Sequence, residues 1–244
     1  MIMAGGAGER LQPLTRERSK GAVPFGGKFR LVDLTLSNCI NSGLRRIYVL
    51  TQYLSESLNR HIQEGWAISS AGLGDYIYCI PAQQKLGTDW YLGTADAVRQ
   101  NLDLINREQV DHVLILSSDH IYKMNYRQMV ACHVRTQAGL TISAIRVKKE
   151  QAAGRLGVLE TAPDQRLTGF AEKTTQSRAL AEDSDRVQAS MGVYLFKVDV
   201  LLQVLQIGGH DFGRDIIPGM MGRATTSSSM TTRRRTGSRI LRWS

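Results

Sequence analysis

The chain has 244 residues, of which 42% are hydrophobic and 22% are charged, so it can bury one sizeable core. The first twenty residues contain no apolar run of the signal-peptide kind and no segment is long enough to span a membrane, which predicts a cytoplasmic protein without a membrane partner. The net charge of +9 belongs largely to residues 223–244, which hold six of the 31 basic residues and none of the 22 acidic ones.

Short apolar runs alternate with segments whose apolar residues recur at helical spacing. The runs expected to form buried strands are Ile47–Leu50, Val113–Leu116, Leu140–Val147 and Met191–Phe196. The segments expected to form helices are Ser55–Gln63, Ala95–Ile105, Tyr126–Gln137 and Asp199–Leu205. Alternation of this kind predicts an α/β domain over residues 1–222, with a mostly parallel sheet covered by helices on both faces.

Two segments depart from this alternation. Residues 157–170 predict two antiparallel strands around a Pro163-Asp164 turn, which would form one wall of a pocket. Residues 223–244 are rich in Thr, Ser and Arg without an apolar period, which predicts a disordered basic tail rather than a nucleic-acid-binding arm. The three cysteines have no C-x-x-C spacing, so the sequence favours buried thiols over disulfides or a zinc site.

A glycine-rich turn, Gly5-Gly6-Ala7-Gly8, follows the apolar residues Met1–Met3 and precedes Arg10. Such a turn directly after a strand lets backbone N–H groups approach a phosphate chain, whose charge a nearby arginine offsets. The alternative is a plain turn, because glycine clusters also form turns that bind nothing.

A carboxylate, Asp119, follows the predicted strand Val113–Leu116. In a parallel sheet the glycine turn and Asp119 leave at the same edge, where a carboxylate and substrate phosphates together hold Mg²⁺. The alternative is that Asp119 only caps the next turn. Lys20 and Lys173 each have two interpretations from the sequence. Each lysine either binds phosphate or is an ordinary surface charge.

Longer stretches of the chain resemble a known family. Residues 5–15 resemble the signature of the sugar-1-phosphate nucleotidyltransferases. Seven further segments narrow the resemblance to the ADP-glucose pyrophosphorylase family, and they are residues 25–33, 36–43, 57–62, 81–84, 90–98, 119–122 and 189–194. The resemblance extends from residue 1 to about residue 222.

The resemblance implies a Rossmann-like nucleotidyltransferase domain that transfers AMP from ATP to α-D-glucose 1-phosphate, with Mg²⁺ as cofactor, giving ADP-glucose for glycogen or starch synthesis and releasing pyrophosphate. It implies catalytic roles for Arg10, Lys20 and Asp119, of which Asp119 also binds the metal. The residues implied to surround the nucleotide are Gly5, Gly6, Gly8, Gln52, Gln83, Trp90 and Gly93. The residues implied to bind the sugar phosphate are Tyr91, Gly157, Glu172, Lys173, Ser190 and Tyr194.

Several positions depart from the family pattern. Glu9 replaces a small hydroxyl residue, Gly21 and Thr174 each replace a proline that follows a lysine, and Ser118 replaces the glycine before Asp119. Glu9 places a negative charge beside the glycine turn, which opposes triphosphate binding.

The family continues into a segment with a second metal-binding aspartate and then into a left-handed β-helix domain. The composition change at Arg223 is typical of a truncation or a reading-frame change, and absence of the β-helix predicts irregular self-association instead of the family's homotetramer. The expected function is adenylyl transfer impaired by the truncation. The alternatives are an inactive fragment that binds nucleotide or sugar phosphate, and a basic interaction protein that uses its tail.

Overall fold

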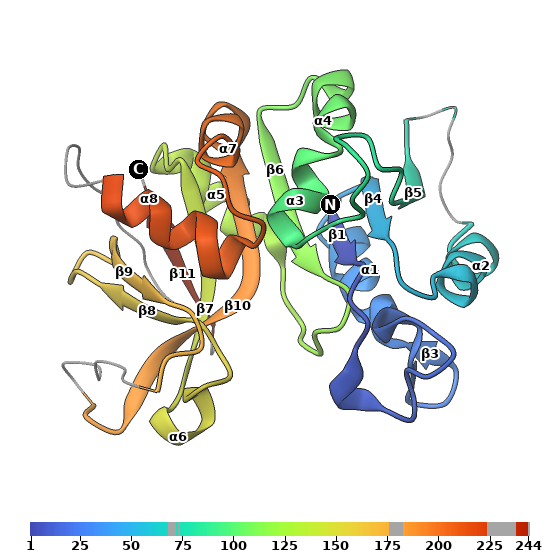
Figure 1. Cartoon of the computed structure of the whole chain (residues 1–244). Coiled ribbons are helices and arrows are strands. Elements are labelled where there is room, and N and C mark those ends of the chain that lie inside the picture. Colours follow the sequence, from blue (N-terminus) through green and yellow to red (C-terminus); the bar gives the residue numbers. More distant parts are fainter. Residues whose placement is uncertain (68–71, 73, 176–182, 224–237, 244) are drawn as a thin grey trace. The chain divides into compact units, whose positions relative to one another are not determined.

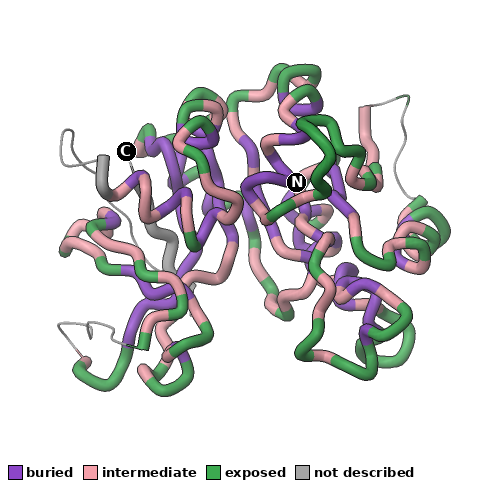
Figure 2. Tube along the Cα trace, in the orientation of Figure 1, coloured by how far each residue is buried: buried purple, intermediate pink, exposed green. Residues whose placement is uncertain are grey.

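The computed structural model describes residues 1–67, 72, 74–175, 183–223 and 238–243. These residues form two compact units (Figure 1). The first unit consists of Met1–Leu92 and Ile115–Arg127, and the second consists of Gly93–Leu114 and Gln128–Ser244. In both units buried positions follow the strands, whereas exposed positions gather on the loops (Figure 2).

The first unit is built on parallel strands. They are β1 (Ile2–Ala4), β4 (Arg46–Thr51), β5 (Tyr76–Pro81) and the end of β6 (His112–Ser117). Strand β1 pairs with both β6 and β4, and β4 pairs with β5. The unit also contains helices α1 (Leu31–Asn41) and α2 (Glu56–Gly65), the 3-10 turns Glu9–Leu11 and Lys20–Ala22, and the short hairpin of β2 (Pro24–Phe25) and β3 (Phe29–Arg30). Five consecutive residues of β4 are buried, as expected for a strand that is covered on both faces.

The second unit is built on antiparallel strands. They are β7 (Leu140–Lys148), β8 (Val158–Thr161), β9 (Leu167–Ala171), β10 (Arg186–Lys197) and β11 (Ser238–Trp243). Strand β7 lies between β10 and β11, and β8 pairs with β10 and β9. The helical segments of the second unit are α3 (Thr94–Arg99), α4 (Leu102–Glu108), most of α5 (Tyr126–Arg135), α6 (Lys149–Ala152), α7 (Val198–Leu205), the π-helical turn Phe212–Ile216 and α8 (Ile217–Arg223).

The predicted α/β class is confirmed, and the sheet is mixed because the strands of the second unit run antiparallel. The four predicted strands lie within β4, β6, β7 and β10, and the predicted hairpin over residues 157–170 is β8 with β9. The predicted helix Ala95–Ile105 is divided into α3 and α4. It breaks at Asn101, whose side chain donates a hydrogen bond to the carbonyl of Ala97 at 2.8 Å and so competes with regular helix geometry.

Within residues 223–244, for which the sequence predicts disorder, Ser238–Trp243 form β11 against β7. An edge strand offers unpaired N–H and C=O groups, so a segment without an apolar period can still pair with it through its backbone. Residues 224–237 and 244 lie outside the described residues, so the rest of that prediction is untested. Every helix in the described part of the chain is too short or too polar to cross a membrane.

Candidate functional site

The predicted site residues divide between the two units. Those in the first unit are Gly5, Gly6, Gly8, Arg10, Lys20, Gln52, Gln83, Trp90, Tyr91 and Asp119, and those in the second are Gly93, Gly157, Glu172, Lys173, Ser190 and Tyr194. Each group is described within its own unit.

The glycine turn of the first unit packs directly against Lys20. Gly8 has a positive φ of 70°, and its carbonyl accepts hydrogen bonds from the amide of Leu11 and the hydroxyl of Thr15, both at 2.9 Å. A Cβ at Gly8 would lie 3.1 Å from the Cβ of Lys20. Both the left-handed backbone and this close approach favour glycine here, and they place the turn beside a lysine.

Lys20 also forms an ion pair with Asp119. The other carboxylate oxygen of Asp119 accepts a hydrogen bond from the hydroxyl of Ser117. Burial acts to raise the pKa of Asp119, but the hydrogen bonds from Lys20 and Ser117 outweigh it and hold the pKa below its ordinary value. Asp119 is therefore an ionised carboxylate at neutral pH, held next to a cation.

The glycine turn and Asp119 leave the sheet at one edge, as the sequence predicts. Strands β1 and β6 are parallel neighbours, with Ile2 opposite Leu116 and Met3 opposite Ser117. The glycine turn follows β1, and Asp119 follows β6. Because the carboxyl ends of parallel strands meet at the same edge, residues separated by more than 100 positions along the chain become neighbours.

The carboxylate of Asp119 is an oxygen ligand of the kind that Mg²⁺ binds. Within the described ranges, no three His, Cys, Asp or Glu side chains gather as a metal-binding group. A cage made of protein ligands alone is therefore not formed by these residues. Mg²⁺ is commonly bound by one or two carboxylates together with phosphate oxygens, and the ionised carboxylate of Asp119 suits that arrangement.

Gly21 and Ser118 lie against each other beside Asp119. A Cβ at Gly21 would lie only 2.9 Å from the hydroxyl oxygen of Ser118. Ser118 is buried, and its hydroxyl occupies space that a side chain at position 21 would need. The serine is therefore accommodated because residue 21 is glycine.

Gln52 uses its side chain to hold the main chain of Tyr91. The Tyr91 amide donates to Gln52 Oε1 at 2.7 Å, and Gln52 Nε2 donates to the Tyr91 carbonyl at 3.4 Å. Gly5 faces the same pair, since a Cβ there would lie 3.3 Å from the Cβ of Gln52. Gln52 thus positions the chain beside the glycine turn, whereas the other predicted side chains of this group, Arg10, Gln83 and Trp90, are exposed.

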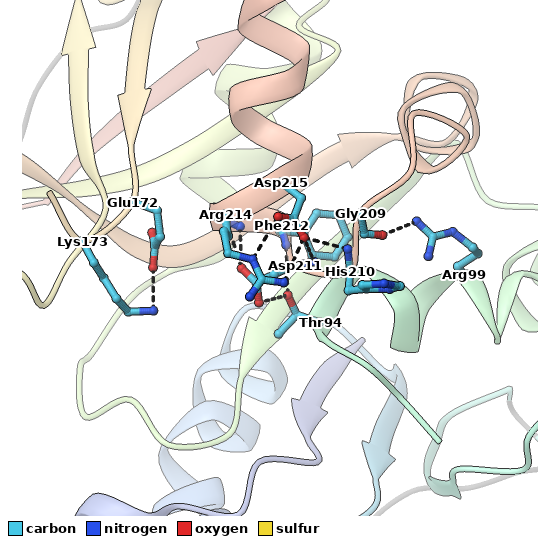
Figure 3. A network of polar contacts seen from close by, with 11 residues as sticks. Thr94, Arg99, Glu172, Lys173, Gly209, His210, Asp211, Phe212, Arg214 and Asp215 are labelled. Carbon is cyan, nitrogen blue, oxygen red and sulfur yellow. Dashed lines mark hydrogen bonds and ion pairs between the residues drawn. The ribbon is translucent and has the colours of Figure 1, made fainter. Parts of the chain in front are cut away.

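The second unit gathers a separate cluster around Glu172. Lys173 Nζ lies 3.0 Å from Glu172 Oε1 (Figure 3). Glu172 Oε2 lies 2.7 Å from the position that a Cβ would take at Gly157. Burial raises the pKa of Tyr194; its hydrogen bond with Ser190 opposes this rise, and the charges of Glu172 and Asp211 add to it. The two carboxylates approach each other at Gly213, where a Cβ would lie 2.8 Å from Glu172 Oε2 and 3.5 Å from Asp211 Oδ1.

The β-bulge in β10 brings Ser190 and Tyr194 into this cluster. The register of β10 against β7 shifts between Ser190 and Tyr194, and Gly192 between them has a φ of 64°. The amide of Gly192 donates to the Ser190 hydroxyl at 3.1 Å. A bulge redirects side chains that a regular strand would place on fixed faces, and it commonly occurs next to functional sites.

Asp211 is not among the residues that the sequence predicts, yet its carboxylate accepts three hydrogen bonds. Its Oδ1 accepts from the amides of Gly213 and Arg214 at 2.9 and 3.1 Å, and its Oδ2 accepts from the Thr94 hydroxyl at 3.0 Å (Figure 3). Asp215 Oδ2 in turn accepts from the amides of residues 210 and 211. The available sequence signal was the close pair of aspartates in residues 210–215.

Gly93 is explained by packing inside the second unit. The carbonyl of His210 accepts hydrogen bonds from the amides of Ala95 and Asp96 at 2.8 and 3.1 Å, at the start of α3. A Cβ at Gly93 would lie 2.3 Å from that carbonyl oxygen. Because the obstructing atom belongs to the backbone, it cannot rotate away.

Gly93→Ala is therefore expected to destabilise the fold by about 1–3 kcal/mol, the usual cost of overpacking. The measurement is the free energy of unfolding in urea. Gly72→Ala is the matched control, since a Cβ at Gly72 meets nothing within 4 Å and its φ is not positive. Equal stability of the two variants would contradict the packing argument.

Comparison with known proteins identifies the family to which the sequence is similar. A family model described as nucleotidyl transferase matches residues 1–243. Glucose-1-phosphate adenylyltransferase 2 of Alkalilimnicola ehrlichii is 47% identical over 229 residues, which cover 92% of this chain and 54% of the relative. Glucose-1-phosphate adenylyltransferase of Koribacter versatilis is 48% identical over 230 residues, covering 91% of this chain and 55% of the relative. Glucose-1-phosphate adenylyltransferase of Methylococcus capsulatus is 47% identical over 224 residues, which cover 89% of this chain and 53% of the relative. The chain spans about half the length of these relatives.

Proposed function

The chain belongs to the nucleotidyl transferase family, and on that basis we propose that it transfers AMP from ATP to α-D-glucose 1-phosphate, forming ADP-glucose and pyrophosphate. The observation that carries this proposal is the contact between three separate segments of the first unit. Gly8 packs on Lys20, and Lys20 pairs with Asp119. A glycine turn, a cation and an ionised carboxylate at one sheet edge suit a nucleoside triphosphate with its metal.

The proposed reaction is an in-line displacement. An oxygen of the glucose 1-phosphate forms a bond to the α-phosphorus of ATP, and the bond from that phosphorus to the bridging oxygen of pyrophosphate breaks. No covalent bond to the protein is needed, so the chain contributes positioning and charge neutralisation.

The residues of the first unit receive the nucleotide. Backbone N–H groups of Gly5, Gly6 and Gly8 face the phosphates, and the exposed Arg10 offsets charge that builds on the departing pyrophosphate. Lys20 neutralises phosphate charge, and Asp119 holds Mg²⁺. When bound, Mg²⁺ supplies charge stabilisation for the phosphate oxygens.

The residues of the second unit receive the sugar phosphate. Lys173 is the cation for its phosphate, while Glu172, Ser190 and Tyr194 offer hydrogen-bonding groups to the sugar. The carboxylate of Glu172 lies next to Gly157, whose lack of a side chain leaves room for it. Support for this assignment comes from the neighbourhood of these groups and from the names of the relatives.

The proposed reaction is tested by pyrophosphate release from the purified chain. We expect release only when ATP, glucose 1-phosphate and Mg²⁺ are all present, and we expect dTTP and GTP to compete poorly with ATP. Binding of both substrates without release would overturn the proposed transfer. Equal or tighter binding of dTTP or GTP would overturn the choice of an adenylyl group.

A further inference from the structure

Helix α1 carries three buried polar residues on one side, and none of them belongs to the site described above. They are Thr35, Asn38 and Ser42, the last being the residue at the end of the helix. Positions three and four residues apart share a helix face, so the three side chains form a polar stripe. Burying a polar side chain destabilises the fold unless the side chain is hydrogen-bonded. The hydrogen-bond partners of these three side chains therefore indicate what the stripe does.

The hydrogen-bond partners of the stripe lie on either side of Asp119, and most of them are main-chain groups; the Asn38 side chain also forms a hydrogen bond with the Tyr126 hydroxyl. The Thr35 hydroxyl donates to the carbonyl of Ser117 at 2.9 Å. Asn38 Nδ2 donates to the Tyr122 carbonyl at 2.9 Å, and Asn38 Oδ1 accepts from the Met124 amide at 3.2 Å. The Ser42 hydroxyl accepts from the amide of residue 126 at 2.8 Å.

The segment held in this way has little regular structure of its own. Between the end of β6 at Ser117 and the start of α5 at Tyr126, no residue belongs to a helix or strand. Its further fixed points are the Ser118 amide, which donates to the Met3 carbonyl, and the contact of 2.7 Å between the hydroxyls of Tyr122 and Tyr126. The side chains of the polar stripe therefore supply hydrogen bonds to main-chain groups of this segment that a strand or helix would otherwise supply.

We propose that Asn38 is a positioning residue for the phosphate-transfer site. It acts through the main chain of Tyr122 and Met124, which fixes the loop that carries Asp119 and so the place where Asp119 meets Lys20. Asn38 suits this role because its amide satisfies both a carbonyl and an N–H group, so it holds the loop at two points from one buried side chain. The proposal extends the proposed function, since it assigns a purpose to Asn38 in the same site.

The first test uses hydrogen exchange on the full, ligand-free chain and is independent of activity. Asn38→Ala removes both main-chain hydrogen bonds, so amides of residues 118–126 should exchange about 10-fold faster, while those of β4 should not change. The matched control is Asn41→Ala, because Asn41 is an exposed asparagine of the same helix. It should leave exchange in residues 118–126 within about 2-fold of the original chain.

The second test compares kinetic constants for pyrophosphate release. Misplacement of a metal-binding carboxylate lowers turnover, so Asn38→Ala should reduce kcat by about 10-fold or more and leave KM for glucose 1-phosphate within about 2-fold. If Asn38→Ala does not fold, Thr35→Val and Ser42→Ala can replace it, since each removes a single contact of the same stripe. Each should speed exchange in residues 118–126 and lower kcat, by smaller factors than Asn38→Ala.

The outcomes separate this proposal from the proposed function. Unchanged exchange in residues 118–126, or faster exchange throughout the first unit including β4, would overturn the positioning role. An unchanged kcat beside faster loop exchange would also overturn it. If the original chain binds ATP and glucose 1-phosphate but releases no pyrophosphate, the proposed transfer fails, and the exchange measurement still decides whether Asn38 fixes the loop.

Discussion

Replacing Asp119 with asparagine is expected to lower the rate of pyrophosphate release by about 10²–10³-fold, the usual loss when one preorganised electrostatic element is removed. Asparagine has nearly the same shape, so it can keep the hydrogen bond from Ser117 but not the negative charge. Lys20 then loses its ion-pair partner, and the metal loses its proposed protein ligand. The measurement is pyrophosphate release at several Mg²⁺ concentrations, and higher Mg²⁺ should restore part of the rate.

The control is Asp111→Asn, which changes an exposed aspartate at the opposite end of β6. It should leave the rate within about 2-fold of the original, since exposed substitutions away from a site have small effects. Loss of rate in both variants would point to a general effect of charge on the fold. A rate for Asp119→Asn within about 3-fold of the original would show that another group supplies the charge.

The depressed pKa of Asp119 gives the same variant a second readout. A group whose pKa is lower in the folded state contributes stability above its unfolded pKa, and that contribution is lost as the pH falls toward the folded pKa. The stability difference between the original chain and Asp119→Asn should therefore be largest near neutral pH and should narrow below about pH 4. Urea unfolding at several pH values measures it.

The sequence predicted those features of the site that follow from strand periodicity. The runs Val113–Leu116 and Met1–Met3 were sufficient to infer that Asp119 and the glycine turn share an edge, because residues that follow parallel strands meet there. The roles of Asp211 and Asn38 were not predicted from the sequence, for a common reason. Asp211 accepts a hydrogen bond from the side-chain hydroxyl of the distant Thr94, and Asn38 bonds main-chain atoms of the distant Tyr122 and Met124. Contacts between distant segments leave no periodic trace in the sequence.

The sequence analysis did not predict helix α1 or strand β5, in which the buried residues and the apolar residues are not the same. Helix α1 buries Asp33, Thr35 and Asn38 among its apolar residues, so its helical period is hidden from a count of hydrophobic positions. Asp33 is buried because it accepts hydrogen bonds from the side chains of His61 and Trp66. Strand β5 is the opposite case, because its sequence is apolar along its whole length but none of its residues is fully buried.

Lys173→Ala is expected to weaken binding of glucose 1-phosphate by about 10- to 150-fold, which corresponds to a lost charge-assisted contact of about 1.5–3 kcal/mol. The variant also leaves Glu172 without its lysine partner, so an uncompensated negative charge remains where the phosphate is proposed to bind. Lys173 has a φ of 49°, a conformation that alanine tolerates no better than lysine. The substitution therefore changes the charged head group while the backbone preference stays nearly constant.

Lys197→Ala is the matched control for that prediction, because both lysine side chains are 51% exposed and both pair with a carboxylate close in sequence. The affinities for ATP and for glucose 1-phosphate are measured separately by titration calorimetry. Lys173→Ala should weaken only the sugar phosphate, since Lys173 pairs with Glu172 and both are proposed to bind that ligand. Lys197→Ala should weaken neither ligand. If Lys173→Ala instead weakened ATP and left glucose 1-phosphate unchanged, Lys173 would have to be reassigned to the nucleotide.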